Sequence, residues 1–392
     1  PNDEYFYSSD WMMYWQWGLY DENYPNSGIQ APDAWDIETG SSSVIIAVVD
    51  TGVLSSHEDL YNKIVRGRNC LADAPDPTNT EDDHGHGTFV ASVAAAMTNN
   101  TIGVAGVSWG SMVMPIKVMN ANGEGTEQDA ADGIVWAADN GAQIINLSLG
   151  TYDDVQALHD AVDYAWGKGC VVVAASGNND SSATFYPAAY DHAIAVGATN
   201  ESMQRCTPDD WGTDEQGNPQ GSNYGSYLDV VAPGNNIFGA AITDELFMGY
   251  YTISAGTSAA APFVSGIAAL VLSHYPTWTN SQIRDQIENT CVDLESTGWD
   301  QHTGWGLVNA YHALADAPPV PVTISDLATL ADGSRVRIQD VVLTSGSSML
   351  WDRFYAEQTD RACGICLPFD DPPAGYSEGN VVTIAGIIKT FA

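Results

Sequence analysis

Runs of apolar, β-branched residues recur along the first part of the chain without the polar alternation of half-exposed strands. Continuous runs of this kind are typical of strands buried on both faces of a parallel sheet. The first run ends at Val49, directly before Asp50. We expect six such strands, at 44–49, 112–118, 143–147, 171–175, 193–196 and 228–231.

Between most of these runs, and after the last one, the apolar residues follow the spacing of a helix. We expect helices at 31–37, 86–97, 126–140, 153–168, 258–274 and 280–289. The alternation of strands and helices predicts an α/β fold, with a parallel sheet and helices on both of its faces. In such folds the functional site lies beyond the carboxyl ends of the strands, where Asp50 stands.

A proline-rich segment at 317–322 predicts a stiff linker between a first domain, 1–316, and a second, 323–392. The second domain holds short β-type runs separated by Gly-containing turns, which predicts a small all-β unit that resembles an OB-like barrel. Its strands are expected at 335–343, 354–357, 364–368 and 381–388. Because the sequence stops just after the last run, truncation of this domain is left open. Residues 1–29 are rich in aromatic side chains and are expected to form an arm over the first domain.

The charge of the chain is strongly acidic, with 50 acidic residues against 12 basic ones and a net charge of −38 at pH 7. Such a surface repels nucleic acid and anionic membranes, which argues against both as partners. The excess fits either a solvated acidic surface or carboxylates that bind calcium; we expect both, with the first accounting for most of the charge. No apolar run is expected to reach the ~18 residues of a membrane span. The start resembles that of a mature or trimmed chain, without a signal peptide.

The chain has six cysteines, too few for a disulfide scaffold. One or two disulfides would fit an extracellular enzyme, and the sequence leaves their pairing open. Cys363 and Cys366 have the spacing of redox and zinc motifs. No second cysteine pair or histidine cluster lies nearby in sequence, so core cysteines or a disulfide are favoured over zinc.

Three short motifs carry candidate chemistry. Asp50 ends a strand in Asp-Thr-Gly, His86 opens a helix in His-Gly-Thr, and Ser258 opens another in Gly-Thr-Ser. Each alone is explained by a helix cap or a turn. A serine hydroxyl becomes a strong nucleophile when a histidine takes its proton and a carboxylate orients that histidine. Together the three motifs predict a catalytic triad.

At these residues the chain resembles the subtilisin-like serine peptidases, the subtilases, and most nearly their thermitase-like secreted branch. The resemblance covers roughly residues 1–315 and includes Ala-Ser-Gly-Asn at 175–178 and Gly-Thr-Ser-Ala-Ala-Ala-Pro at 256–262. It implies a subtilisin-like fold in which Asp50 orients His86, His86 is general base and acid, and Ser258 is the nucleophile. Asn178 and the backbone N–H of Ser258 would hold the oxyanion.

The resemblance also implies where a substrate binds. Two short segments would form the edges of a cleft in which an extended peptide is held by main-chain hydrogen bonds. Binding through the main chain favours broad sequence specificity. The residues of these edges are Gly123, Glu124, Gly125, Ser148, Leu149 and Gly150.

Calcium is the cofactor that the resemblance implies. The ligands of a first site would be side-chain oxygens of Asp3, Asp59 and Asn100 with the carbonyl oxygens of Thr98, Ile102 and Val104. An all-oxygen shell suits Ca²⁺, although an acidic surface loop is the alternative. A second calcium site is expected at Asp73, Asp76 and Thr78.

The sequence therefore predicts a secreted, extracellular, calcium-stabilised serine endopeptidase of broad specificity, a hydrolase of peptide bonds. Its expected partners are polypeptide substrates and its own pro-segment during maturation, and we expect a monomer. The alternative is a catalytically silent binding protein on the same fold, with recognition by the β-domain. That domain could also direct the enzyme to insoluble protein or to a cell surface.

Overall fold

The computed structural model describes residues 1–6, 16–20, 27–72, 74–243 and 249–316 and, beyond these, the strands of a C-terminal region. The chain divides into two compact units, Pro1–Asp316 and Ala317–Ala392. The first unit contains the candidate site, and each unit is described by itself.

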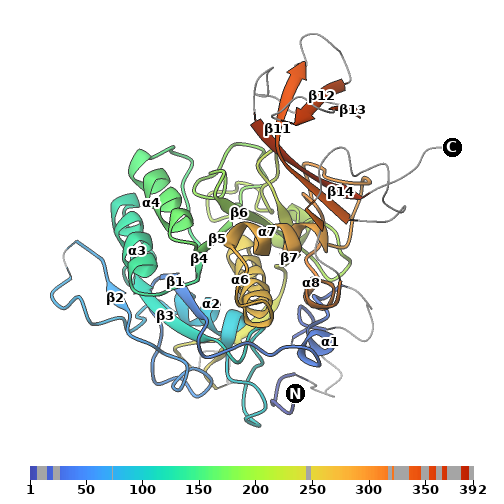
Figure 1. Cartoon of the computed structure of the whole chain (residues 1–392). Helices are drawn as coiled ribbons and strands as arrows, with labels where there is room; N and C mark the ends of the chain where they lie inside the picture. Colours follow the sequence, from blue (N-terminus) through green and yellow to red (C-terminus); the bar gives the residue numbers. More distant parts are fainter. Residues whose placement is uncertain are drawn as a thin grey trace. The chain divides into compact units, whose positions relative to one another are not determined.

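The first unit is built on a seven-stranded sheet in the order β2-β3-β1-β4-β5-β6-β7. All neighbouring pairs of this sheet are parallel, which confirms the predicted parallel α/β fold (Figure 1). The strands are β1 (Ile45–Asp50), β2 (Arg68–Asn69), β3 (Met112–Lys117), β4 (Ile144–Leu147), β5 (Val171–Ala175), β6 (Ala193–Thr199) and β7 (Val230–Pro233).

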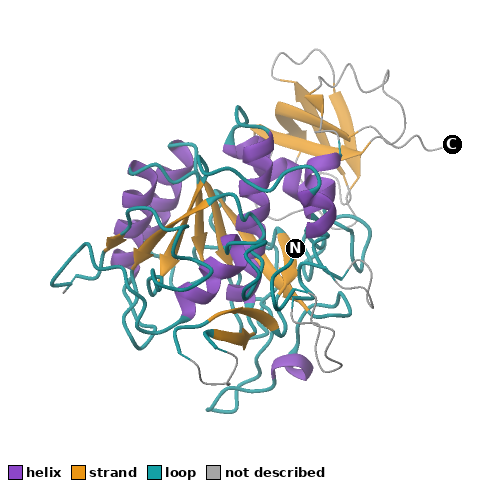
Figure 2. Cartoon of the chain, turned by 90° about the horizontal axis from the view of Figure 1, so that it is seen from below, coloured by secondary structure: helices purple, strands orange, loops and turns teal. Residues whose placement is uncertain are grey.

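Helices cover both faces of the sheet (Figure 2). They are α1 (Ala31–Trp35), α2 (His86–Ala95), α3 (Glu127–Asp139), α4 (Gln156–Gly167), α5 (Pro208–Trp211), α6 (Thr257–His274), α7 (Asn280–Asn289) and α8 (Ala310–Ala315). Successive strand residues point to opposite faces. In β1, Ile46 and Val48 pack in the apolar cluster of α2 and α6, whereas Ala47 and Val49 pack in that of α3 and α4.

By length and composition alone α6 is able to cross a membrane, with a mean hydropathy of 1.3, so the expectation that no stretch qualifies is wrong. It is the one such helix in the part of the chain that the structure describes. However, 83% of it is buried inside the protein. The apolar run of α6 therefore reflects its central place in the core, between α2 and strands β4 to β7.

Before α6 the chain forms an antiparallel hairpin that the sequence patterns did not predict. The hairpin consists of β8 (Ile237–Ala240) and β9 (Tyr251–Ser254). Two residues, Ala255 and Gly256, separate β9 from the first turn of α6. The hairpin thus leads directly into the helix that carries Ser258.

The described residues of the second unit form one five-stranded sheet, and every described element there is a strand, as predicted. The long β11 pairs antiparallel with β12 and β14 and parallel with β10. The resemblance to an OB-like barrel stays a prediction. The strands are β10 (Val320–Pro321), β11 (Arg335–Ser345), β12 (Arg353–Gln358), β13 (Gly364–Pro368) and β14 (Val381–Ile387).

The four cysteines whose side chains the structure describes, Cys70, Cys170, Cys206 and Cys291, are free thiols. No disulfide joins any two of these four cysteines. Burial raises the pKa of Cys70 and of Cys170 to about 11, so these thiols stay protonated at neutral pH. The Cys-x-x-Cys motif lies outside the described side chains.

Candidate active site

The geometry of the candidate site begins with a carboxylate and an imidazole. Asp50 is the last residue of β1 and is fully buried, and His86 is the first residue of α2. His86 Nδ1 lies 2.8 Å from Asp50 Oδ1 and 3.0 Å from Oδ2. A carboxylate in this position keeps the imidazole proton on Nδ1 and leaves the lone pair on Nε2.

The charge around His86 favours its protonated form. Burial lowers the pKa of His86, but the negative charge and the hydrogen bond of Asp50, together with the charge of Asp82, more than offset it. The pKa of His86 is therefore raised above its ordinary value. A raised pKa makes the neutral ring a stronger base and stabilises the cation that forms when it accepts a proton.

Asp82 is a buried carboxylate that the sequence analysis missed. Its Oδ1 accepts hydrogen bonds from Thr51 Oγ1 at 2.9 Å and from Gly85 N at 2.8 Å, and its Oδ2 accepts from Thr88 N at 2.9 Å. Burial raises the pKa of Asp82, but the hydrogen bonds from Gly85, Thr88 and His84 outweigh burial and lower the pKa overall, so the carboxylate is ionised. Asp82 thereby caps the start of α2, where His86 sits, and ties it to the residue after Asp50.

Ser258 and Asn178 meet at Gly256. The backbone of Gly256 has φ 142°, a conformation that side-chain-bearing residues rarely adopt. A Cβ atom placed on Gly256 would lie 3.1 Å from Ser258 Oγ and 3.3 Å from Asn178 Nδ2. The hydroxyl and the amide therefore border the same space, and glycine leaves that space open. Ser258 Oγ has no hydrogen-bond partner among the described residues.

The orientation of Asn178 is fixed by its neighbour Thr257. Asn178 Oδ1 accepts hydrogen bonds from both the backbone N–H and the hydroxyl of Thr257, each at 2.9 Å. The same hydroxyl accepts a hydrogen bond from Gly177 N at 3.1 Å. Because the amide oxygen is engaged in this way, Asn178 presents its Nδ2 donor toward the space beside Ser258.

Ser148 links Ser258 to the side of the site that carries His86. Its hydroxyl donates a 2.8 Å hydrogen bond to the carbonyl oxygen of Ser258 and accepts one of 2.9 Å from Asn146 Nδ2. Ser265, about two turns further along α6, donates to Asn146 Oδ1 at 2.8 Å. These buried hydrogen bonds hold the start of α6 against the end of β4.

A cavity of about 530 Å³ adjoins His86, and we name it the edge cavity. Thr51, His84 and Ser148 also line it. All six residues predicted as substrate edges border it: Gly123, Glu124, Gly125, Ser148, Leu149 and Gly150. The fold thus brings the two predicted edge segments to one hollow beside Asp50 and His86.

The predicted residues of the first calcium site also lie together. Asp3 and Asp59 are buried, and burial raises the pKa of both carboxyls. Asn100 bridges them: its backbone N donates to Asp3 Oδ1 at 3.1 Å and its Nδ2 donates to Asp59 Oδ1 at 2.7 Å. Two buried carboxylates without a lysine or arginine partner among the described residues fit a cation.

The carbonyl groups of this loop support the same fit. The carbonyl oxygens of Thr98, Ile102 and Val104 accept no hydrogen bond from a described residue. Oxygens of this kind are the ligands that Ca²⁺ prefers. Asn100 would need to turn its amide so that the oxygen, not the NH₂ group, faces Asp59. The donor set as a whole suits a calcium ion.

The second predicted calcium site has less support in the structure. Asp76 and Thr78 form a local turn in which Asp76 Oδ1 accepts from Thr78 N at 2.8 Å and Thr78 Oγ1 at 2.6 Å. These hydrogen bonds lower the pKa of Asp76, and its carboxylate is exposed. Asp73 lies outside the described residues, so this site stays a prediction.

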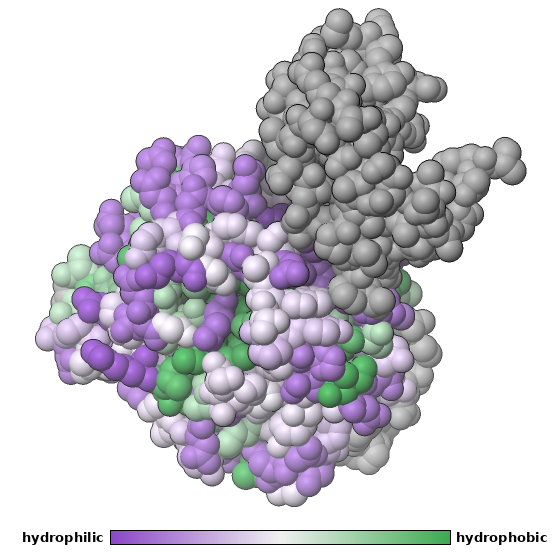
Figure 3. Space-filling model, viewed as in Figure 1, coloured by the Kyte–Doolittle hydropathy of each residue, from purple (hydrophilic) through white to green (hydrophobic). Residues whose placement is uncertain are grey.

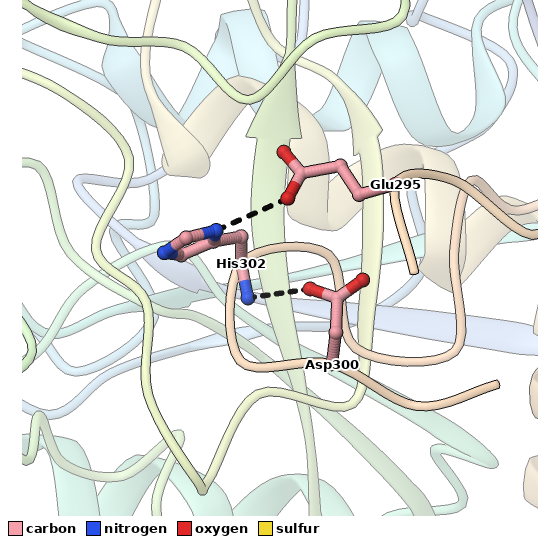
Figure 4. Close-up of side chains that lie close together, drawn as sticks. All are labelled: Glu295, Asp300 and His302. Atoms are coloured by element: carbon pink, nitrogen blue, oxygen red, sulfur yellow. Dashed lines mark hydrogen bonds and ion pairs between the residues drawn. The ribbon is translucent and has the colours of Figure 1, made fainter. Parts of the chain in front are cut away.

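One further group of potential ligands lies in the loop after α7 (Figure 4). His302 Nδ1 lies 3.1 Å from Glu295 Oε2, and the backbone N of His302 donates to Asp300 Oδ1 at 2.8 Å. Asp300 also accepts from Thr303 N and Thr303 Oγ1. The three residues offer ligand atoms within 4.8 Å of one another, but the hydrogen bonds of a tight turn account for the arrangement.

Comparison with known proteins places this geometry in context. A family model described as the subtilase family matches residues 41–306. A thermophilic serine proteinase of Bacillus sp. (strain AK1) is 42% identical over 281 residues, which span 72% of this chain and 64% of that relative. Thermitase of Thermoactinomyces vulgaris is 40% identical over 316 residues, 80% of this chain and 99% of its own length. A solved structure of a protease from Pseudoalteromonas arctica matches with a TM-score of 0.68 and 30% identity, covering 80% of this chain and 98% of that one.

Proposed function

Because this chain belongs to the subtilase family of serine peptidases, as its motifs suggested, we propose that it is a secreted endopeptidase that cleaves extended polypeptides with broad specificity. The observation that carries the proposal is that the predicted catalytic residues form two groups of neighbours. Asp50 holds His86 through Nδ1 on one side, and Ser258 and Asn178 share the open space at Gly256 on the other.

In the proposed reaction Ser258 Oγ attacks the carbonyl carbon of the peptide bond while His86 Nε2 takes the hydroxyl proton. The carboxylate of Asp50 stabilises the imidazolium. The oxyanion accepts hydrogen bonds from Asn178 Nδ2 and the backbone N–H of Ser258. His86 then gives its proton to the leaving amine, and a water activated in the same way hydrolyses the acyl-enzyme.

The position of α6 assists this chemistry. The first N–H groups of a helix are not used within it, and they carry partial positive charge. Ser258 is the second residue of α6, so its own N–H belongs to this set. A negative charge that forms beside Ser258 is therefore stabilised by groups that are in place before the reaction begins.

The substrate is proposed to lie extended between 123–125 and 148–150, the two edges of the cavity beside His86. Main-chain hydrogen bonds to both edges would hold it as an added strand. Binding of this kind recognises the backbone of the substrate, which supports broad specificity.

Calcium is proposed as a structural cofactor, held by Asp3, Asp59, Asn100 and the carbonyl oxygens of Thr98, Ile102 and Val104. The ion would neutralise the two buried carboxylates and join the N-terminal residues to the 98–104 loop. It takes no part in the reaction. We also propose that the enzyme is a monomer, matures with its own pro-segment and is released outside the cell, as its resemblance to the secreted subtilases implies.

Covalent labelling tests the proposed function. A fluorophosphonate reagent should label the folded chain at Ser258, as located by peptide mass spectrometry. Ser258→Ala should abolish labelling and lower peptide hydrolysis by several orders of magnitude without unfolding the protein. A matched pair separates the two neighbouring histidines: His86→Ala should be nearly inactive, whereas His84→Ala should keep measurable activity. A folded chain that takes up no reagent would favour the binding-protein alternative.

A further inference from the structure

We propose that the edge cavity selects substrates that carry arginine or lysine close to the cleaved bond. The inference rests on the proposed peptidase function, because it assigns a substrate preference to the same cleft. Three properties of the cavity lead to it: its floor, its charge and its size.

The floor of the edge cavity is apolar. Val118, Ala130 and Leu158 line it and are buried, and the half-buried Leu149 faces it from the other edge. At about 530 Å³ the cavity holds a long side chain with room to spare. Lysine and arginine have methylene stems that pack on apolar surface while their charged ends stay near the opening.

The rim of the cavity carries unpaired negative charge. Glu124 is exposed and Glu127 is half-buried, and both line the cavity. Neither carboxylate has a hydrogen-bond or ion-pair partner among the described residues, and the lining contains no lysine or arginine. The lining also contains two histidines, His84 and His86. A cationic side chain would therefore meet two free carboxylates.

The start of α3 does not cancel this charge. Glu127 is the first residue of α3, and a helix start carries partial positive charge. That charge is already met by Asp129, whose Oδ2 accepts hydrogen bonds from Thr126 N at 3.1 Å and Thr126 Oγ1 at 2.7 Å. Lys117, a nearby cation in sequence, is held by Asp83 at 2.7 Å. Glu124 and Glu127 are left to act on the substrate.

Matched fluorogenic peptides test the preference on the full chain. The peptides differ at one position at a time, over the four residues on each side of the cleaved bond, and carry arginine, the neutral norleucine or glutamate there. We expect kcat/KM at one position to be roughly 5-fold to 20-fold higher with arginine than with norleucine, and lowest with glutamate. The arginine preference should shrink in 1 M salt, where charges are screened beyond about 3 Å.

Two double variants locate the source of the preference. Replacing both rim carboxylates, with Glu124→Gln and Glu127→Gln, should bring the arginine-to-norleucine ratio close to one. The control, Asp160→Asn with Glu215→Gln, removes the same net charge from exposed residues that do not line the cavity and should keep the ratio. A ratio that falls equally in both would assign the effect to the overall charge and overturn the inference.

The outcomes separate this inference from the function beneath it. Wild-type enzyme that cleaves the norleucine peptides without preferring arginine at any position overturns the inference and leaves the peptidase intact. If none of the peptides is cleaved and the reagent also fails to label Ser258, the peptidase function itself is overturned. Arginine preference that survives in the Glu124/Glu127 double variant also overturns the assignment.

Discussion

Two buried carboxylates act on His86, and they do so in different ways. Asp50 makes the direct contact with Nδ1, whereas Asp82 acts through the start of α2 and through its charge. Lys63 is a buried charge of the opposite kind: its Nζ donates to the carbonyl of Trp109 at 2.6 Å and has no carboxylate partner among the described residues. At the scale of single residues, Asp82 and Lys63 therefore each lead to a prediction about pH.

Asp82→Asn should move the acid limb of the kcat/KM profile to lower pH. The Asp82 charge helps to raise the pKa of His86, so its loss lets the imidazolium give up its proton more readily. We expect a shift of less than about one pH unit. The control is Asp83→Asn, whose carboxylate is exposed and bound to Lys117, and whose profile should stay in place. An acid limb that stays put in the Asp82 variant, measured on protein with normal circular dichroism, would refute the argument.

Lys63→Met should stabilise the protein below about pH 8 and lose this advantage at higher pH. Burial lowers the pKa of Lys63 from 10.5 to about 8 in the folded chain. Between these two values the unfolded chain binds the proton and the folded chain does not, so wild-type stability rises with pH across that window. The full effect is roughly 3 kcal/mol. Denaturant unfolding of both proteins at pH 7 and pH 10 measures it; a constant difference between them would contradict the prediction.

The loop that carries Asn178 depends on another element. The segment 206–223 contains α5 and ends at the buried Asn223, whose Oδ1 accepts from Asn179 N at 2.9 Å and Ser181 N at 3.1 Å. The backbone N of Asn223 also donates to Gly177 O at 2.9 Å. At the scale of elements, this segment supports the loop of the predicted oxyanion donor from behind.

Asn223→Ala should lower kcat by about 10-fold to 100-fold with little change in KM, because small displacements of a catalytic donor are costly. Asn223→Asp keeps the accepting oxygen and should recover part of the loss. Asn218→Ala, in the exposed turn of the same segment, is the matched control and should resemble wild type. Equal kcat in the Asn218 and Asn223 variants would exclude the supporting role.

All the long elements of the first unit were predicted from the sequence, and the elements that were missed there are short. The strand at 171–175 and the helix at 280–289 begin and end at the predicted residues, because burial or amphipathic spacing extends over their whole length. The hairpin β8–β9, the two-residue β2 and the four-residue α5 are too short for any period to show.

In the candidate site, residues in local motifs were predicted and residues that act through distant contacts were missed. Asp50, His86, Ser258 and Asn178 stand in local motifs, and the structure shows Asp50 in contact with His86 and Ser258 bordering the same space as Asn178. Asp82 and Asn223 act through contacts with residues 31 and 44 positions away. Such contacts depend on the tertiary fold and leave no local pattern, although an aspartate four residues before His86 was a signal that could have been tested.

At the scale of the whole molecule, hydrophilic side chains dominate the outer surface over α3 and α4 (Figure 3), in keeping with the net charge of −38. The N-terminal residues are bound to distant parts of the first unit: Asp3 to the 98–104 loop, Gln16 to Ala105, and Trp17 Nε1 to Asn235 O at 2.9 Å. These contacts hold the N-terminal residues on the first unit, and the contact of Asp3 lies where the first calcium site is proposed.

Removal of calcium should lower the melting temperature and speed self-digestion. An ion bound by the folded chain alone stabilises it by about 2.7 kcal/mol at a concentration 100-fold above its Kd. Asp59→Ala should remove most of the sensitivity to chelator, while Asp36→Asn, at an exposed carboxylate, should keep it. Melting curves with excess chelator or calcium measure this, on Ser258→Ala protein to prevent digestion. Identical wild-type curves in the two conditions would count against the site.

A chain that ends at Asp316 should fold and cleave small peptides at close to the full rate. The compact unit Pro1–Asp316 contains every predicted catalytic residue, and α8 closes it through Ala310 N, which donates to Ile29 O at 2.7 Å. Activity of the shortened chain on a chromogenic peptide, compared with the full chain, is the measurement. An unfolded or inactive product would mean that the two units share a core.

The parallel order of the seven-stranded sheet has a kinetic consequence. No two neighbouring strands of that sheet are joined by a tight turn, so each pairing must wait until a long stretch of chain has left the sheet and returned. Chains of this topology cross a high barrier when they fold, and the same barrier slows the reverse step. A peptidase molecule that unfolds is digested by other molecules of the same enzyme. Its working lifetime is therefore set by the rate of unfolding more than by the equilibrium between the folded and unfolded states. The parallel strand order thus helps to set how long the enzyme works before it digests itself.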